Sequence, residues 1–174
     1  RVMFPILDNQ HRPIGFGGRV LEEKPEAGGK YINTSEGRLF QKRKLLFGLN
    51  FAAKEIGLTR TAVIVEGYTD TILCHQHGIR NTVATLGTSL TPGHGRTLRR
   101  YAKKVVLVFD SDTAGMAAAN RALEVCLSQH LDIKLGFVPQ GKDPCEFLLA
   151  AGKEAFDRIV EQAADVLDFK WAKV

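Results

Sequence analysis

Four acidic residues in this sequence could bind a metal ion together. Each of Glu66, Asp110 and Asp143 comes shortly after an apolar run, and Asp112 lies two residues beyond Asp110. If the apolar runs are parallel strands, their carboxyl ends share one edge of a sheet, where ligands bind. Crowded carboxylates repel one another unless a cation relieves them. Because Mg²⁺ prefers carboxylate oxygens, the pattern indicates a divalent-metal site for a phosphate-bearing substrate.

Asp110 and Asp112 allow other interpretations. An Asp-x-Asp pair after a strand also begins phosphotransferases of the haloacid-dehalogenase type, in which the first aspartate is a nucleophile. Asp112 precedes Thr113 and could serve only as a helix N-cap, with no metal involved. The pair formed by Glu66 and Gly67 favours the metal site, since the small Gly67 lets a phosphate or base approach closely.

The elements that would position these acids alternate along the chain from residue 61. Short β-rich runs alternate with segments of helical periodicity, which is typical of right-handed βαβ crossovers and a parallel sheet covered on both faces. We expect an α/β fold with a four-stranded parallel sheet. The expected strands are 62–65, 81–86, 105–109 and 133–138, the expected helices are 71–78, 92–104 and 113–130, and the chain is expected to be helical from residue 144 to its end.

The N-terminal third has a different, extended pattern. Residues 2–7 and 14–20 flank a polar turn and are expected to form a hairpin, and residues 31–34 a further short strand. Apolar residues then recur at helical spacing from Leu45, with Gly57 as the expected helix stop.

The basic residues are distributed unevenly. The chain has 174 residues and a formal net charge of +5, and all of this excess lies in residues 1–60. Basic residues also recur over 96–104, where a phosphate-binding face and a merely solvated helix face are both possible; the sequence favours the solvated face. This set consists of Arg96, Arg99, Arg100, Lys103 and Lys104.

Composition excludes several classes of protein. With 44% hydrophobic residues the chain is not disordered, and no apolar run approaches the ~20 residues of a membrane span. We therefore expect no membrane partner. The three cysteines are widely spaced, which favours a reducing cytoplasm over a disulfide framework. Cys74, His75 and His77 resemble half of a zinc site, but the sequence has no second Cys/His pair to complete it.

Seven motifs, in order, resemble one family. They resemble the RNA-polymerase domain of bacterial DNA primase, the DnaG type, over nearly the whole chain. The resemblance implies that residues 61–140 are a Toprim catalytic domain, 1–60 part of the N-terminal basic subdomain, and 141–174 the start of a C-terminal helical subdomain. The motifs are RVMFPI (1–6), GFGGR (15–19), KYIN (30–33), LFGL (46–49), EGYTD (66–70), TLGT (85–88) and FDSDTAG (109–115).

The resemblance also implies roles for individual residues. Glu66 corresponds to the catalytic glutamate, Asp110 and Asp112 to a catalytic, metal-binding pair, and Asp143 to a further metal ligand. The implied cofactor is Mg²⁺ or Mn²⁺, and two such ions would activate a 3′-hydroxyl and stabilise the leaving pyrophosphate. The residues implied to bind template, nascent RNA or triphosphate are Arg19, Lys30, Tyr31, Asn33, Lys42, Gly67 and Asp70.

The implied activity is synthesis of short RNA primers on single-stranded DNA from ribonucleoside triphosphates. The family's zinc-binding domain and its helicase-binding domain have no counterpart here, so zinc and the replicative helicase are expected only outside this chain. Two departures stand out: Cys145 occupies a position that is commonly Asp, and Ser111 one that is commonly Gly. The alternatives are a Toprim nuclease or topoisomerase fragment, and a non-catalytic nucleic-acid-binding module.

Overall fold

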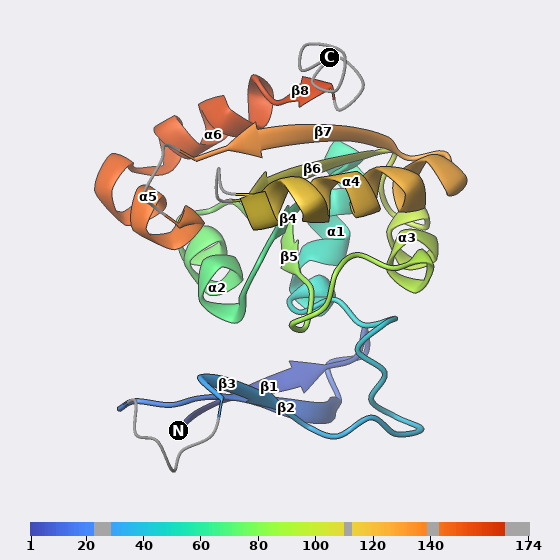
Figure 1. Cartoon of the computed structure of the whole chain (residues 1–174), viewed down its shortest axis with the longest axis vertical. Helices are drawn as coiled ribbons and strands as arrows, with labels where there is room; N and C mark the ends of the chain where they lie inside the picture. The colour runs from blue at the N-terminus through green and yellow to red at the C-terminus, as the bar shows by residue number, and fades with distance from the viewer. Residues whose placement is uncertain (23–28, 110–112, 139–142, 166–174) are drawn as a thin grey trace.

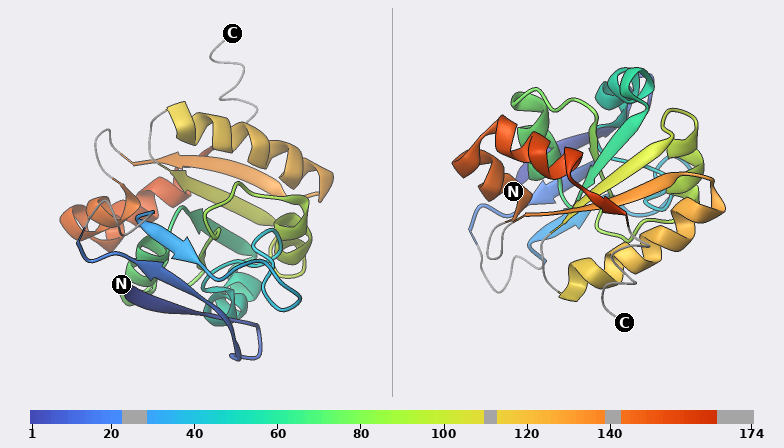
Figure 2. Two further views of the ribbon diagram at one scale, coloured as in Figure 1. Left: turned by 60° about the horizontal axis from the view of Figure 1, so that its bottom comes forward. Right: turned by 90° about the horizontal axis from the view of Figure 1, so that it is seen from above.

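Two β-sheets organise the protein. The computed structural model describes residues 1–22, 29–109, 113–138 and 143–165, with the backbone alone for 113–119. A three-stranded antiparallel sheet has the order β1-β2-β3, and a five-stranded sheet has the order β5-β4-β6-β7-β8. Figure 1 and Figure 2 show the small sheet as a separate layer beside the larger α/β unit.

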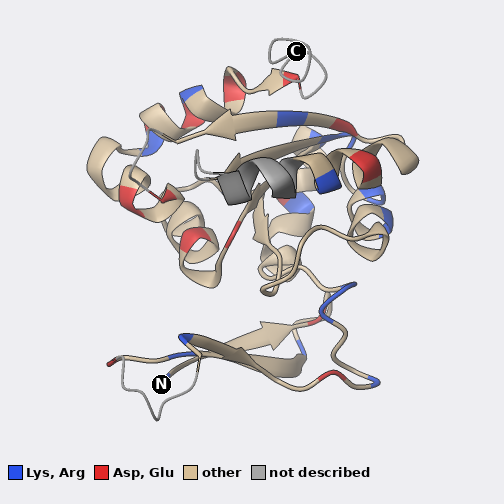
Figure 3. Ribbon diagram, viewed as in Figure 1, with Lys and Arg blue, Asp and Glu red and all other residues tan. Residues whose placement is uncertain are grey.

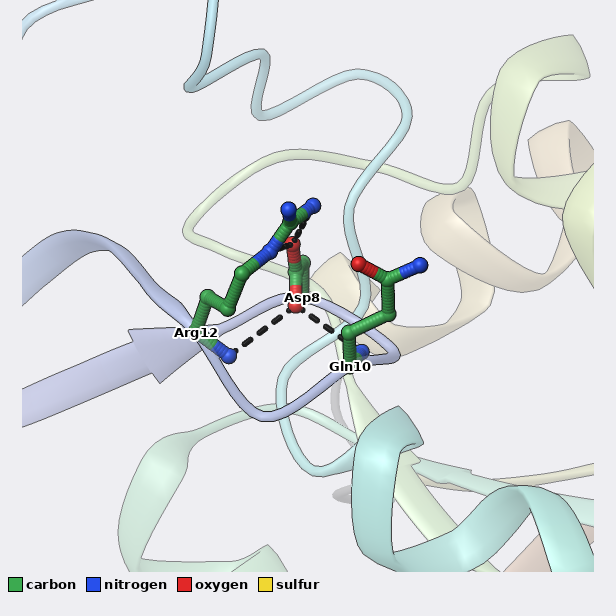
Figure 4. A network of polar contacts seen from close by, with 3 residues as sticks. All are labelled: Asp8, Gln10 and Arg12. Carbon is green, nitrogen blue, oxygen red and sulfur yellow. Dashed lines mark hydrogen bonds and ion pairs between the residues drawn. The ribbon is translucent and has the colours of Figure 1, made fainter.

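The small sheet contains the expected hairpin. Strand β1 (Val2–Leu7) pairs with β2 (Pro13–Arg19), and β2 pairs with β3 (Tyr31–Asn33). The turn between β1 and β2 is held by the carboxylate of Asp8, which accepts hydrogen bonds from the amides of Gln10 (2.8 Å) and Arg12 (3.0 Å) and from the Arg12 guanidinium (2.8 Å; Figure 4). The hydrogen bond from the Arg12 side chain lowers the pKa of Asp8.

The larger sheet confirms the expected parallel core. Strands β4 (Thr61–Val65), β5 (Thr82–Ala84), β6 (Lys104–Phe109) and β7 (Asp132–Phe137) are parallel. A fifth strand, β8 (Ala164–Asp165), pairs antiparallel with β7. The expectation of helix to the end of the chain is therefore wrong at β8, because a two-residue edge strand is too short to produce an alternating pattern.

Helices cover both faces of this sheet. On one face, α1 (Leu49–Thr59), α3 (Pro92–Arg99) and α4 (Thr113–Ser128) pack on Ile64 and Leu107. On the other, α2 (Tyr68–Gln76), α5 (Pro144–Ala151) and α6 (Lys153–Glu161) pack on Val63 and Val106. Alternate strand residues thus enter opposite cores, as a doubly covered parallel sheet requires. No helix among the described residues has the length and apolar character to cross a membrane.

Two helix ends differ from expectation. Helix α1 continues through Gly57 to Thr59 and ends at Arg60, which has a positive φ of 55°. Helix α3 ends at Arg99 rather than at 104, because the amides of Tyr101 and Ala102 both turn back to the carbonyl of Leu98. That turn frees Lys104 to begin β6 opposite Thr61.

A small aromatic core joins the two sheets. Ile6, Phe40, Tyr68 and Leu86 form one buried cluster between them. Gly17 of β2 lies directly against the Tyr68 ring: a Cβ at this position would come within 2.6 Å of it. The absence of a side chain at Gly17 therefore allows the small sheet to pack this closely.

The chain between the sheets is fixed to α3 by polar side chains. His94, fully buried, donates from Nε2 to the carbonyl of Lys42 (2.7 Å) and accepts at Nδ1 from the amide of Thr91 (3.2 Å). The hydroxyl of Thr91 donates to the carbonyl of Arg43 (2.5 Å). Burial lowers the pKa of His94, so its ring is neutral at pH 7.

We expect opposite effects of alanine at two glycines. Gly57→Ala should raise the free energy of unfolding by about 0.5–1 kcal/mol, because Gly57 is inside a helix with no neighbour within 4 Å of a new Cβ. Gly17→Ala should lower it by about 1–3 kcal/mol through overpacking against Tyr68. Urea denaturation measures both; equal effects of the two substitutions would contradict this account of the interface.

The stability should also depend on pH through His94. A histidine whose folded pKa lies below its unfolded value contributes stability above the unfolded pKa, near 6.5, and that contribution is lost as the pH falls below it. The free energy of unfolding should therefore fall from pH 7 to 5, and His94→Gln should flatten this dependence. His75, whose pKa is also lowered by burial, should account for part of the remaining slope. An unchanged slope in His94→Gln would contradict the assignment.

Candidate active site

A polar pocket of about 370 Å³ lies where the small sheet meets the larger one. Its walls come from β2 and β3 on one side and from the ends of β4 and β5 and the beginnings of α2 and α5 on the other. It brings together residues from distant parts of the chain that the sequence analysis selected separately. These are Arg19, Lys30, Tyr31, Asn33, Glu66, Gly67, Asp70 and Asp143.

Glu66 is placed by the end of strand β4. The four preceding residues are buried in the sheet, whereas Glu66 is exposed at the carboxyl edge. This is the edge at which parallel α/β sheets bind ligands. The structure therefore has Glu66 at the carboxyl edge of the sheet, as the sequence predicted.

Asp70 lies in the first turn of α2 and is buried, with 7% of its surface exposed. Its Oδ2 accepts a hydrogen bond from the amide of Gly67 at 2.9 Å. The amino end of a helix carries partial positive charge, which stabilises a carboxylate there. Asp70 thus has a structural role in beginning α2, in addition to the binding role implied by its motif.

Asp143 is the N-cap of α5. Its Oδ1 accepts a hydrogen bond from the amide of Glu146 at 2.7 Å, and Pro144 follows as the first helical residue. Asp143 was predicted to be a metal ligand; its capping role was not predicted. Since the cap uses Oδ1, Oδ2 is left for a cation.

Asp70, Asp143 and Cys145 meet in one group, with one potential ligand atom from each lying within 4.8 Å of the others. Burial first, and then the neighbouring carboxylates, raise the pKa of Cys145 to about 11, so the thiol carries no charge at pH 7. The group thus offers two hard carboxylates and one neutral thiol. Two carboxylates fit a Mg²⁺-like ion, which is usually bound by one or two of them with substrate phosphates and water, whereas a thiol is a poor ligand for it.

Asp110 and Asp112 lie outside the described residues. The strand that leads to them, β6, ends at Phe109 and is the immediate neighbour of β4 in the sheet. Glu66 follows the end of β4 in the same way that Asp110 follows β6 in the sequence.

The opposite wall of the pocket is basic and aromatic. Arg19 and Tyr31 are paired across β2 and β3, with the guanidinium 5.5 Å from the centre of the Tyr31 ring. Lys30 precedes Tyr31, and Asn33 donates from Nδ2 to the carbonyl of Leu86 at 3.4 Å. Acidic positions mark α2, α5 and the end of β4, while the small sheet supplies the basic residues of this pocket (Figure 3).

Lys42 is the one predicted binding residue of the described set that does not line this pocket. Its amide donates to the carboxylate of Glu36 at 3.0 Å, and its carbonyl accepts from His94. It lies instead beside α3.

Tyr68, Thr85 and Gly87 are among the pocket residues that were not predicted from the sequence. Tyr68 donates its hydroxyl proton to Oδ1 of Asn33, and burial raises the pKa of Tyr68 to about 12. Thr85 and Gly87 line the pocket after β5, and Gly87 has a positive φ of 69°. The EGYTD and TLGT motifs contain these residues and were the signal that could have identified them.

Two family models match the chain. A Toprim-like model matches residues 63–148, and a model of the N-terminal domain of the DNA primase catalytic core matches residues 1–53. A DNA primase of Clostridium acetobutylicum is 48% identical over 171 residues, which is 98% of this chain and 28% of that relative. The chain thus spans less than a third of the length of this relative.

Solved structures of DNA primase domains are also similar to this chain. A DNA primase domain from Pseudomonas aeruginosa is similar with a TM-score of 0.90 and 38% identity, over 98% of this chain and 54% of that one. A DnaG primase catalytic domain bound to single-stranded DNA is similar with a TM-score of 0.86 and 40% identity, over 95% of this chain and 53% of that one.

Substitutions at Asp143 can separate its capping role from the metal-binding role that the sequence predicts. Asp143→Asn keeps a capping oxygen and should change stability little, whereas Asp143→Ala should cost about 1 kcal/mol. Both should weaken Mn²⁺ binding, because both remove the negative charge. Thermal unfolding and Mn²⁺ titration by electron paramagnetic resonance measure the two effects; full Mn²⁺ affinity in Asp143→Asn would exclude this residue as a ligand.

Proposed function

The chain belongs to the bacterial DnaG-type DNA primase family, and from this membership we propose that it is part of a catalytic core that joins ribonucleotides on a single-stranded DNA template. The observation that carries the proposal is the pocket between the two sheets, which has carboxylates on one wall and cations on the other. Such a pair of walls suits a triphosphate, whose charge must be neutralised by a metal ion on one side and by basic groups on the other. The similar domain bound to single-stranded DNA supports the choice of template.

The proposed division of the chain follows the motifs. Residues 1–60 would be part of the N-terminal basic subdomain, 61–140 the Toprim catalytic domain and 141–174 the start of a helical subdomain. The match of the N-terminal model over residues 1–53 supports a primase rather than a Toprim nuclease, whose chemistry would need no such unit.

The acidic edge is the proposed metal site. Glu66, Asp110, Asp112 and Asp143 would hold Mg²⁺ or Mn²⁺, with Asp70 at the same edge. The ion, when bound, would supply Lewis-acid activation of the attacking hydroxyl and charge neutralisation at the leaving pyrophosphate. Glu66 and the aspartate pair would be the catalytic residues.

The basic wall is the proposed site for nucleotide and template. Arg19 and Lys30 would bind phosphate oxygens, and the Tyr31 ring, held against Arg19, presents a flat apolar face to a base. Asn33 is fixed by Tyr68 and Leu86 and can position the nucleotide only from that one orientation. The chemistry these residues supply is placement and charge neutralisation.

The function of the whole protein extends beyond this chain. The chain covers 28% of the Clostridium acetobutylicum DNA primase. Zinc binding and contact with the replicative helicase are therefore proposed for parts of the protein outside this chain. The nascent RNA primer is a further proposed ligand of the basic wall.

We expect metal-dependent nucleotide binding that needs the acidic edge. A fluorescent ribonucleoside triphosphate should bind more tightly with Mn²⁺ than without, and Glu66→Gln and Asp110→Ala should each weaken the metal-dependent part about tenfold or more, which is ~1.4 kcal/mol. Glu124→Gln, an exposed substitution on α4, is the matched control and should bind normally. Binding that ignores both Mn²⁺ and Glu66 would exclude the proposed site.

A further inference from the structure

A second basic surface lies on α3, outside the pocket. We call it the α3 cationic face, and in the described structure its side chains are all exposed. Figure 3 shows basic positions gathered on α3 and on the segment that precedes α1. The face consists of Arg43, Lys44, Arg96, Arg99, Arg100 and Lys103.

The two segments of this face are held together by hydrogen bonds. Three successive carbonyls, those of Lys42, Arg43 and Lys44, accept from His94, Thr91 and Thr97 of the α3 segment, the last at 3.5 Å. A Cβ at Gly93 would come within 2.4 Å of the Arg43 carbonyl, so the contact is close. The backbone that carries Arg43 and Lys44 is therefore fixed beside the exposed side of α3.

The charge of this face is not neutralised by the protein in the part of the chain that the structure describes. The ion pairs found there, Arg12 with Asp8 and Lys153 with Asp157, involve none of its side chains. Three acidic residues lie on segments that contact this face. Glu36 accepts from the amide of Lys42, and the amide of Asp132 donates to the carbonyl of Lys103. Glu124 is exposed on α4, which packs against α3. The six cations outnumber these carboxylates and leave an attractive field for a polyanion.

The face begins close to the pocket. Gly87 lines the pocket, and Thr91, which donates to the Arg43 carbonyl, is only four residues further along the chain. Four residues span at most about 14 Å. A span of about 14 Å equals the rise of roughly four nucleotides along one DNA strand. A single DNA strand can therefore contact both the pocket and the α3 cationic face.

The chemistry of the face selects phosphate rather than bases. The exposed aromatic residues of the described structure are Phe16, Tyr31 and Phe51, none of which is on α3 or on residues 41–44. Tyr101, beside the face, is half-buried and its ring is already covered by the Arg100 guanidinium at 6.0 Å. Cations without an exposed ring beside them bind the backbone of a nucleic acid with no preference for sequence.

We propose that the α3 cationic face binds the phosphate backbone of the single-stranded template outside the reaction pocket. The proposal rests on the proposed function for the identity of the strand, and on the face itself for the contact. Phosphate binding is thus assigned to basic residues for which the sequence favoured a solvated helix surface.

Salt dependence of DNA binding tests the proposal. Binding of a fluorescent oligo(dT) to the whole chain would be measured by anisotropy at several salt concentrations, in EDTA, so that nucleotide and metal chemistry play no part. Arg43→Gln/Lys44→Gln and Arg96→Gln/Arg99→Gln should each weaken binding and reduce the slope of log K against log[salt] by about 1.4, because each phosphate that is no longer neutralised accounts for about 0.7. The control Lys54→Gln/Arg158→Gln removes the same charge from exposed positions on α1 and α6 and should leave the slope unchanged.

The salt slopes of the three double variants show whether the α3 cationic face contacts the DNA strand. Equal slopes in all three double variants would overturn the proposal. So would face variants that weaken binding of a duplex of the same length, measured in parallel, without weakening binding of the oligo(dT). A changed slope in the two face variants, with unchanged melting temperatures, would support it. Failure of metal-dependent nucleotide binding in the earlier experiment would remove the proposed function without affecting this result, so the two can be distinguished.

Discussion

The contact between Tyr68 and the small sheet is the constraint on which the site depends. The Tyr68 ring stacks on Phe4 with a centroid distance of 5.3 Å and meets Phe47 edge-on at 4.7 Å, while its hydroxyl bonds to Asn33. The basic wall of the pocket belongs to the small sheet and the acidic wall to the larger one. This aromatic core holds the sheets together so that the two walls face one another, with Gly17 allowing the close approach.

Helix geometry explains how the acidic wall can exist before any cation binds. Asp70 and Asp143 are both in the first turn or cap of a helix, where backbone amides and the helix dipole stabilise negative charge. Helices α2 and α5 also pack against one another, which brings the two carboxylates to the same place. The N-cap interpretation and the metal interpretation are thus compatible for Asp143, because its cap uses one carboxylate oxygen, Oδ1.

Much of this arrangement followed from sequence pattern, and the failures have physical causes. The alternation of apolar runs and helical segments predicted the four parallel strands, and the shared edge predicted that Glu66 and Asp143 would line one pocket. Patterns could not show that a helix continues through Gly57, because glycine is tolerated inside helices as well as at their ends, and the packing of the buried Leu49, Ala52 and Ile56 stabilises α1 as a whole. Nor could they show the role of Tyr68, because its partners come from β1, β3 and the segment before α1, and only tertiary packing brings these together.

Cys145 shows the balance between stability and cation affinity at this edge. The family resemblance implies that an aspartate is common there, and a third carboxylate within 4.8 Å of two others would add repulsion on the order of 3 kcal/mol per pair at an effective dielectric constant of about 20. A neutral thiol avoids that repulsion in the metal-free protein. At the proposed metal site, the thiol would also give a hard cation one fewer charge to bind, so more of the neutralisation would come from Glu66 and from the phosphates of the substrate. Such an edge would hold its ion most tightly when the nucleotide is present, which would couple metal binding to substrate binding.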